Sequence, residues 1–241
     1  MTKWLAVVWY YTLKKQRLVL IIIAILTGSI VSRSMKGLPF WIPMLGAPFI
    51  DTNNDTSNTL LYDWLFVNSL FLYVSIDSQW LIWRGFFMHL RLKGIRPFTV
   101  YAVAFLMNVL IPLSLIFIVL LISSIVSVTR GDISLYQFDR LHFVYMLLLW
   151  VLGATFSGWL ALLIALLTNN IYYGYMMTCV LLIVSVLTYP FFLWLPGSQW
   201  IYGAHFIHGG PTYIVSVLYL SILVLAEFII GYKIALGYSI M

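Results

Sequence analysis

The sequence predicts an all-α, polytopic membrane protein with six transmembrane helices. Of its 241 residues, 63% are hydrophobic and only 8% are charged, whereas an ordinary soluble domain carries about 25% charged residues. The charges also cluster, because no Asp, Glu, Lys or Arg occurs in 98–129 or in 141–226. A transmembrane helix needs about 20 apolar residues, so these two stretches are long enough for several spans. Soluble enzymes, disordered regulators and disulfide scaffolds are excluded.

The first segment, 1–16, predicts a short helix that lies in the membrane interface. Trp4, Val7, Val8 and Tyr11 follow one another at helical spacing, and a basic cluster comes directly after them. An apolar face beside basic residues is typical of helices that lie in the plane of the interface rather than across it.

Six apolar stretches follow, separated by segments that contain prolines, glycines or charged residues. The third stretch is longer than the hydrocarbon core is thick, so we expect it to tilt, to project, or to bend near Pro112. The predicted spans are 18–33, 60–76, 98–128, 142–167, 171–189 and 213–236.

Three connecting segments are informative. Segment 34–59 combines three prolines with a polar run, which predicts an external loop. Residues 168–170 (Thr-Asn-Asn) predict a tight turn between the fourth and fifth spans. Segment 190–211 stays apolar but is interrupted by prolines and glycines, so it is too broken to span the membrane. It predicts a re-entrant hairpin on the outer side.

Segment 78–93 has the pattern of a basic amphipathic helix between the second and third spans. Trp80, Trp83 and Phe87 recur at spacings of three and four, and Arg84 and Arg91 are interspersed. One interpretation is a helix on the membrane surface whose basic residues meet anionic headgroups. The other is a docking element whose aromatic and arginine side chains enter a groove on a soluble partner. The residues alone favour both about equally.

The distribution of basic residues sets the orientation. When the N-terminus is placed inside, most of the 13 Lys and Arg residues fall on inner segments, as the positive-inside rule requires. We therefore expect both termini and segment 78–93 in the cytoplasm. Because the basic residues lie along membrane edges, the high pI of about 9.4 does not indicate nucleic-acid binding.

Four small residues in the fourth span recur at every fourth position, which predicts a strip that lets another helix approach closely. These residues are Gly153, Ser157, Ala161 and Ala165.

Few residues suggest chemistry. His142, His205 and His208 fall on the predicted outer side and could hold Zn²⁺, but interfacial histidines among aromatic residues more often form ordinary hydrogen bonds. Glu227 is the acidic residue deep in a span, which suggests a proton-coupled carrier. A polar partner or water near the cytoplasmic end is the favoured interpretation of Glu227.

Nucleotide-binding motifs are missing. Neither G-x-x-x-x-G-K-S/T nor G-x-G-x-x-G occurs in the sequence. If ATP drives this protein, another polypeptide must bind the nucleotide.

The order of these parts resembles the membrane subunit of an ABC-2-type (type V) ABC exporter. The stretch Trp83-Arg84-Gly85-Phe86-Phe87, followed by the basic run 91–96, is similar to the segment that precedes and forms the coupling helix in that family. The chain departs from the family by having no acidic residue in this segment after Asp77.

The resemblance implies a half-transporter in the bacterial cytoplasmic membrane. A second permease subunit, identical or different, would complete the pathway, and two cytosolic ATPase subunits would hold ATP and Mg²⁺. This chain would carry no cofactor or catalytic residue of its own, and it would bind no nucleic acid. Hydrophobic or amphipathic substrates, such as a membrane-active peptide, a bacteriocin or a lipid, fit the apolar spans, and a role in self-immunity follows from the same idea. The docking residues implied are Trp80, Trp83, Arg84, Phe87 and Arg91.

Two other classes stay open. One is a secondary carrier that is driven by an ion gradient through Glu227. The other is an integral membrane enzyme with an outer-face metal site at the histidines.

Overall fold

The computed structural model confirms the all-α class in the part of the chain that it describes. Regular structure there is helical throughout, with no strand. The described residues are 10–11, 14–33, 56–83, 94, 96–131, 140–188, 191–201, 205 and 210–238.

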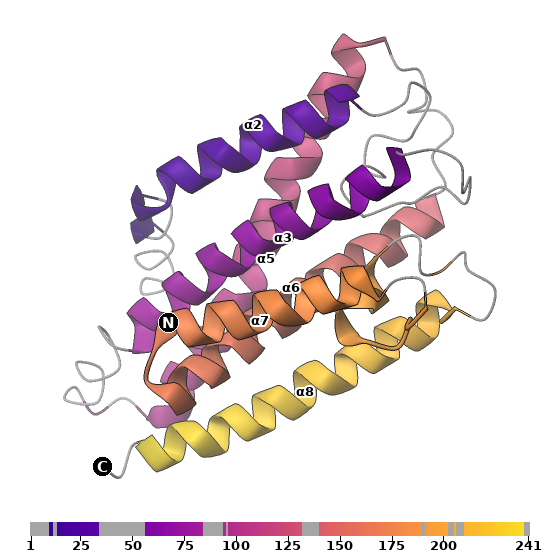
Figure 1. The fold of residues 1–241 in the computed structure, drawn as a ribbon. Helices are drawn as coiled ribbons and strands as arrows, with labels where there is room; N and C mark the ends of the chain where they lie inside the picture. The colour runs from indigo at the N-terminus through magenta and orange to yellow at the C-terminus, as the bar shows by residue number, and fades with distance from the viewer. Residues whose placement is uncertain are drawn as a thin grey trace.

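Six long helices are formed by the described residues, together with one short 3-10 helix, η4, that precedes the last of them (Figure 1). Their bounds are α2 (Arg17–Arg33), α3 (Thr56–Leu81), α5 (Pro97–Thr129), α6 (Arg140–Thr168), α7 (Ile171–Leu187), η4 (Pro196–Trp200) and α8 (Tyr213–Tyr238).

Three stretches of these helices are long and apolar enough to cross a membrane, namely Phe98–Thr129, Phe143–Thr168 and Tyr213–Ile234. Arg17–Ser32 and Ile171–Leu187 are apolar but shorter. Within its described residues, α3 does not meet the same criterion. A membrane protein is therefore indicated, and six spans remain a prediction.

Helix α3 differs from the predicted second span, which ended at 76 and was followed by a separate helix from 78. The helix instead continues to Leu81 and passes into a π-helical turn at 82–83. Residues 76–81 contain neither proline nor glycine, so nothing in the sequence interrupts the backbone hydrogen bonds. Asp77 consequently lies inside a helix rather than in a connection.

Helix α5 begins where the sequence provides a start signal. Pro97 occupies the first turn and Arg96 is extended before it, as expected because the proline ring favours an extended preceding residue and needs no hydrogen-bond partner in the first turn. The helix is assigned without interruption through Pro112. It lies obliquely to its neighbours instead of beside them along its whole length (Figure 1).

Successive helices run in alternating directions, so their ends gather at two ends of the bundle (Figure 1). At the first end, Lys15, which precedes α2, meets Asp77 of α3. At the same end, Phe98 near the start of α5 packs against Tyr232 near the end of α8. We call this the Lys15 end. The opposite, hairpin end holds the connection between α7 and α8.

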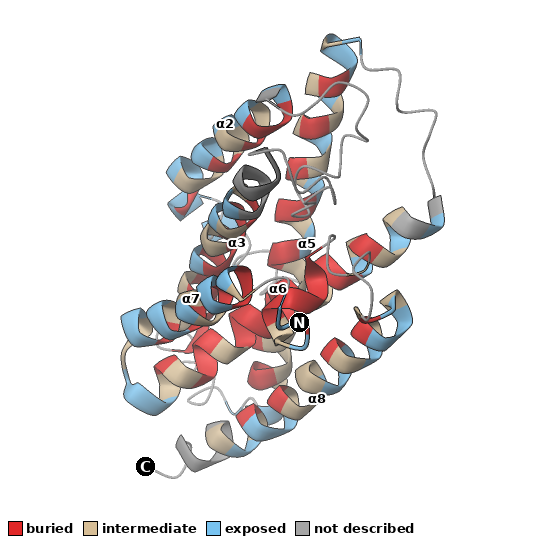
Figure 2. Ribbon diagram, turned by 45° about the vertical axis from the view of Figure 1, so that its right-hand side comes forward, coloured by how far each residue is buried: buried red, intermediate tan, exposed pale blue. Residues whose placement is uncertain are grey.

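Helix α6 lies at the centre. Its buried residues are distributed along most of its length, whereas α2, α7 and α8 each carry a continuous exposed face (Figure 2). It contacts α3, α5, α7 and α8. The predicted strip of small residues is buried on this helix, and Gly174 of α7 comes so close to Ala161 and Ala165 that a Cβ on it would lie 2.9 Å from the Ala165 Cβ.

The turn between α6 and α7 is built by two asparagines. Asn169 adopts a positive φ of 53°, a left-handed conformation that Asn tolerates better than most residues. Asn170 caps α7, because its side-chain oxygen accepts a hydrogen bond of 2.9 Å from the Tyr172 backbone N–H. These two residues produce the tight turn that the sequence predicts at 168–170.

The described part of the predicted hairpin is folded against the bundle. Gly197, Ser198, Gln199 and Trp200 of η4 are all buried, and η4 contacts α6, α7 and α8. Trp200 packs edge-on against Trp64 of α3, with ring centroids 5.0 Å apart. The described part of this segment is therefore packed inside the bundle at the hairpin end, and a re-entrant element on the outer side stays a prediction.

Candidate functional site

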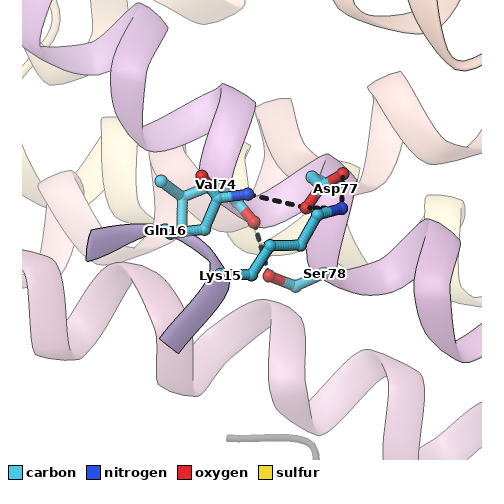
Figure 3. Close-up of polar contacts among 5 residues, drawn as sticks. All are labelled: Lys15, Gln16, Val74, Asp77 and Ser78. Carbon is cyan, nitrogen blue, oxygen red and sulfur yellow. Dashed lines mark hydrogen bonds and ion pairs between the residues drawn. The ribbon is translucent and has the colours of Figure 1, made fainter. Parts of the chain in front are cut away.

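A polar tie joins α2 to α3 at the Lys15 end (Figure 3). The Lys15 Nζ lies 2.8 Å from both carboxylate oxygens of Asp77, and the Gln16 side-chain amide donates to the same carboxylate at 2.6 Å. Lys15 and Asp77 thus form an ion pair. It fixes the start of α2 against the last turns of α3.

The position of Asp77 indicates why two partners are needed. A carboxylate near the C-terminal end of a helix opposes the helix dipole, so it is destabilising unless other groups compensate. Lys15 is exposed, and an exposed ion pair contributes about 0–1 kcal/mol. Gln16 is only 3% exposed, so its hydrogen bond to a charged group contributes more, about 1.5–3 kcal/mol. Most of the stabilisation therefore comes from Gln16.

The predicted docking segment follows directly. Trp83 is buried and packs edge-on against Tyr101 of α5, with ring centroids 6.2 Å apart. Trp80 is half-buried against the core. Both rings therefore face inward in this structure and anchor the end of α3. Arg84, Phe87 and Arg91 lie outside the described residues, so their docking role stays a prediction.

A network of buried amides joins α3, α5 and α6 in the interior. The Gln79 amide donates to the Asn108 side-chain oxygen, and the Asn108 amide donates to the Thr155 carbonyl at 2.7 Å. Gly158 makes room for Asn108, since a Cβ on this glycine would overlap the Asn108 side-chain oxygen. Closer to the hairpin end, the Trp150 indole donates to Asn68 at 2.8 Å. Apolar helices are thereby held in one register by a few directional contacts.

Glu227 lies on α8 near the Lys15 end and is 7% exposed. Neither of its carboxylate oxygens has a hydrogen-bond partner among the described residues. The backbone beside it is firmly held, because Trp159 donates to the Glu227 carbonyl and Tyr101 donates to the Phe228 carbonyl. Glu227 is thus a buried acidic group on a well-anchored helix, which is the arrangement that the carrier hypothesis needs.

His205 belongs to a second polar cluster at the hairpin end. Its Nδ1 lies 3.0 Å from the Pro211 carbonyl oxygen, and its Nε2 lies 3.0 Å from the Gln199 carbonyl oxygen. Gln199 in turn accepts a hydrogen bond of 2.7 Å from the Ser216 hydroxyl of α8. Burial lowers the pKa of the His205 imidazole, an effect that its two carbonyl contacts partly oppose. This cluster holds the hairpin to the start of α8.

The metal hypothesis gains no support from His205, since both ring nitrogens face backbone carbonyls. His208 and the side chain of His142 lie outside the described residues. Across the described side chains, no three His, Cys, Asp or Glu groups come together as metal ligands. Cys179 is a free thiol on α7.

The strip of small residues on α6 contacts Trp200 of η4 as well as helix α7. Gly153 faces the ring of Trp200, where a Cβ would lie 2.7 Å from Cε2. Ser157 donates to the Gly153 carbonyl on its own helix at 2.8 Å. The Trp200 indole therefore packs directly against Gly153 at the hairpin end.

Sequence reasoning missed the amides Asn68, Gln79 and Asn108 as a group. Each interrupts an otherwise apolar helix, and a buried amide among apolar residues needs a partner. That rule could have singled them out, although it could not have paired them.

No protein-family model, curated protein or solved structure matches this chain. What the protein does must therefore be inferred from its own residues.

Proposed function

We propose that this chain is the membrane permease subunit of an ATP-driven ABC exporter of the ABC-2 type. In this proposal all six long helices cross the bacterial cytoplasmic membrane, and both termini lie in the cytoplasm at the Lys15 end. The chain pairs with a second permease subunit and with cytosolic ATPase subunits that bind ATP and Mg²⁺. The hairpin end faces outward.

The arrangement of charge supports this orientation. Lys14, Lys15, Arg17 and Lys233 lie near helix termini at the Lys15 end, together with Arg96 before α5. Basic residues concentrate on the cytoplasmic side of membrane proteins. The alternating helix directions bring residues from three distant parts of the sequence to that one side.

The observation that carries the proposal is the tie between Lys15, Gln16 and Asp77. Asp77 lies on α3 just before the basic segment 84–96, and that segment leads into α5. A partner that pushes on the segment would move α3 and α5 directly. It would also move α2 through Asp77, because Gln16 and Lys15 bind the same carboxylate. In this proposal a force applied to segment 84–96 reaches α2, α3 and α5 together.

The exposed faces of the bundle support a proposal for the substrate class. Large apolar side chains dominate the exposed faces of α2, α5, α7 and α8, and they offer few partners for a hydrated sugar. The proposed substrate is a hydrophobic or amphipathic molecule, such as a membrane-active peptide or a lipid, and the proposed role of its export is self-immunity.

The test is whether a soluble ATPase co-purifies with the tagged protein from the native membrane. We expect an ATPase that contains a P-loop, and we expect Arg84→Ala with Arg91→Ala to release it. Lys233→Ala is the matched control, since Lys233 is an exposed basic residue at the same end on α8. If no ATPase appears, or if the Lys233 variant releases it equally, the docking proposal is wrong.

Glu227 supports one alternative, a carrier driven by a proton gradient. Its buried carboxylate has no hydrogen-bond partner within the described structure, and such a group in a membrane helix is costly unless it has a function. In this case Glu227→Gln abolishes gradient-driven transport into proteoliposomes without nucleotide. Under the exporter proposal, the same variant leaves ATP-dependent transport largely intact.

A further inference from the structure

An apolar groove opens between α2 and α5, and its volume is about 590 Å³. This size falls within the range of ordinary ligand pockets, about 300–1,000 Å³. Its walls come from Leu20 on α2, Val74 on α3, most residues between Ile111 and Leu120 on α5, and Leu147 on α6. The oblique course of α5 explains the groove, because two helices that diverge from a crossing point leave a wedge between them (Figure 1).

The groove wall has almost no hydrogen-bonding capacity left. Its polar side chains are Gln16 and Ser114. The Gln16 amide donates to Asp77, and the Ser114 hydroxyl donates to the Leu110 carbonyl of its own helix at 2.9 Å. A peptide in extended form would bury backbone N–H and C=O groups here without hydrogen-bond partners, which is unfavourable. A hydrocarbon chain has no such groups.

Basic residues adjoin one end of the groove in the sequence. Gln16 lines the groove at the Lys15 end, and its neighbours in the sequence are Lys14, Lys15 and Arg17. Lys15 and Gln16 together occupy the carboxylate of Asp77. Lys14 and Arg17 are both exposed. Positive charge thus lies within two residues of a side chain that lines the groove, where it would attract an anionic headgroup.

From these two features we propose that the groove binds an acyl chain of an anionic phospholipid from the inner leaflet, with the phosphate at Arg17 and Lys14. The proposal rests on the membrane orientation given under the proposed function. It assigns a role to Gln16, which contacts the lipid chain on one side and Asp77 on the other. Lipid binding is in this way connected to the tie between α2 and α3.

The test uses the purified full-length protein in nanodiscs, without nucleotide or ATPase. The probes are phosphatidylglycerol and phosphatidylcholine with the same diazirine-labelled acyl chain. We expect phosphatidylglycerol to label residues 111–120 of α5, and phosphatidylcholine to label them at least fivefold less. Arg17→Gln should lower labelling by phosphatidylglycerol about fivefold, since one basic residue near an anionic surface contributes about that factor. Lys233→Gln, a matched loss of charge at the same end, should change it little.

Two variants fill the groove from opposite walls, Leu20→Trp on α2 and Ser114→Phe on α5. Each should reduce labelling of 111–120 at least tenfold. The control is Ile21→Trp, because Ile21 is 57% exposed and does not line the groove. A thermal unfolding curve for each variant shows whether it is folded, and two independent blocking variants keep the test decisive if one of them is not.

Several results would overturn the proposal. One is equal labelling by the two lipids; another is labelling spread evenly to exposed positions such as Ile125. A third is efficient disulfide formation between copies of a Leu113→Cys variant, which would show that a second copy covers the groove. The outcome is separable from the exporter proposal. Groove labelling without any co-purifying ATPase refutes only the exporter, and an ATPase without groove labelling refutes only the lipid site.

Discussion

Replacing Gly153 by alanine should lower the free energy of unfolding by disturbing the packing of Trp200 at the hairpin end. The added Cβ would lie 2.7 Å from the Trp200 Cε2, whereas carbon atoms in contact normally lie about 3.5–4.0 Å apart. The indole must therefore move by roughly 1 Å or more. It has little room to do so, because Trp200 is 1% exposed and its other side packs against Trp64.

The size of the effect follows from two limits. Overpacking a dense core costs about 1–3 kcal/mol, and complete loss of a buried tryptophan costs about 3–5 kcal/mol. Gly153→Ala should fall in the lower range, because the ring shifts and is not removed. For a chain of this length, that corresponds to a fall in Tm of roughly 3–10 °C.

Thermal unfolding in detergent measures this change, and Gly28→Ala is the matched control. Gly28 also lies in a long helix, but no neighbouring atom lies within 4 Å of the position of an added Cβ. Alanine there should be neutral or stabilising by up to about 1 kcal/mol, because it favours the helix. The two glycines thus separate helix propensity from steric overlap.

A double variant tests the cause. Trp200→Ala removes the ring, so Gly153→Ala should add almost no further destabilisation in that background. The explanation is refuted if Gly153→Ala is as mild as Gly28→Ala. It is equally refuted if the effects of Gly153→Ala and Trp200→Ala simply add.

Three further predictions concern the polar contacts. Asp77→Asn should lower the free energy of unfolding by about 1–2 kcal/mol, because charge-assisted hydrogen bonds are lost. Lys15→Gln should lower it by less, because the Lys15 side chain is exposed. Thermal unfolding measures both, and equal losses would contradict the assignment of Gln16 as the main partner of Asp77. Asn108→Leu should lower the free energy of unfolding by about 1–2 kcal/mol, because it leaves the Gln79 amide unpaired. Adding Gln79→Leu to this variant should restore part of the lost stability, because replacing both partners by apolar groups can be nearly neutral. If the double variant is no more stable than Asn108→Leu, the network does not contribute as described. Burial lowers the pKa of His205 in the folded state, so the unfolded chain binds more protons. The free energy of unfolding should therefore fall as the pH drops from about 7 through about 6.5, by at most about 1.4 kcal/mol per pH unit. A His205→Asn variant with an identical pH profile of Tm would exclude this residue as the cause.

The sequence was sufficient for features that depend on neighbouring residues. Composition predicts helices in a membrane, and the asparagines at 169–170 predict the turn because their preferences for a left-handed residue and for a helix cap are local. The start of α5 at Pro97 is similarly local. The end of α3 was not predicted, because an apolar stretch followed by Asp77 looks like the end of a span when hydropathy alone is considered.

The pairing of helices could not be predicted for a physical reason. In a soluble helix the apolar face identifies the core, but lipid is as apolar as the protein interior, so membrane helices lack that distinction. Asn108 and Gln79 lie 29 positions apart, and Gln16 and Asp77 lie 61 positions apart. The strip on α6 was visible in the sequence, but the indole of Trp200 that rests on Gly153 was not.

Contacts to different helices hold the two ends of α5, in addition to the bonds of Asn108 near its middle. At the hairpin end, Arg130, which follows α5, donates to the Val31 carbonyl of α2. At the other end, Phe98 packs on Tyr232 of α8. The helix has 33 residues and is therefore roughly 50 Å long at 1.5 Å per residue. If the Arg130 contact holds as a pivot, a rotation of about 5° displaces the far end by roughly 4 Å on that length. Such a rotation would change the distance between α5 and α2. A small angular change would therefore alter the width of the groove between these helices.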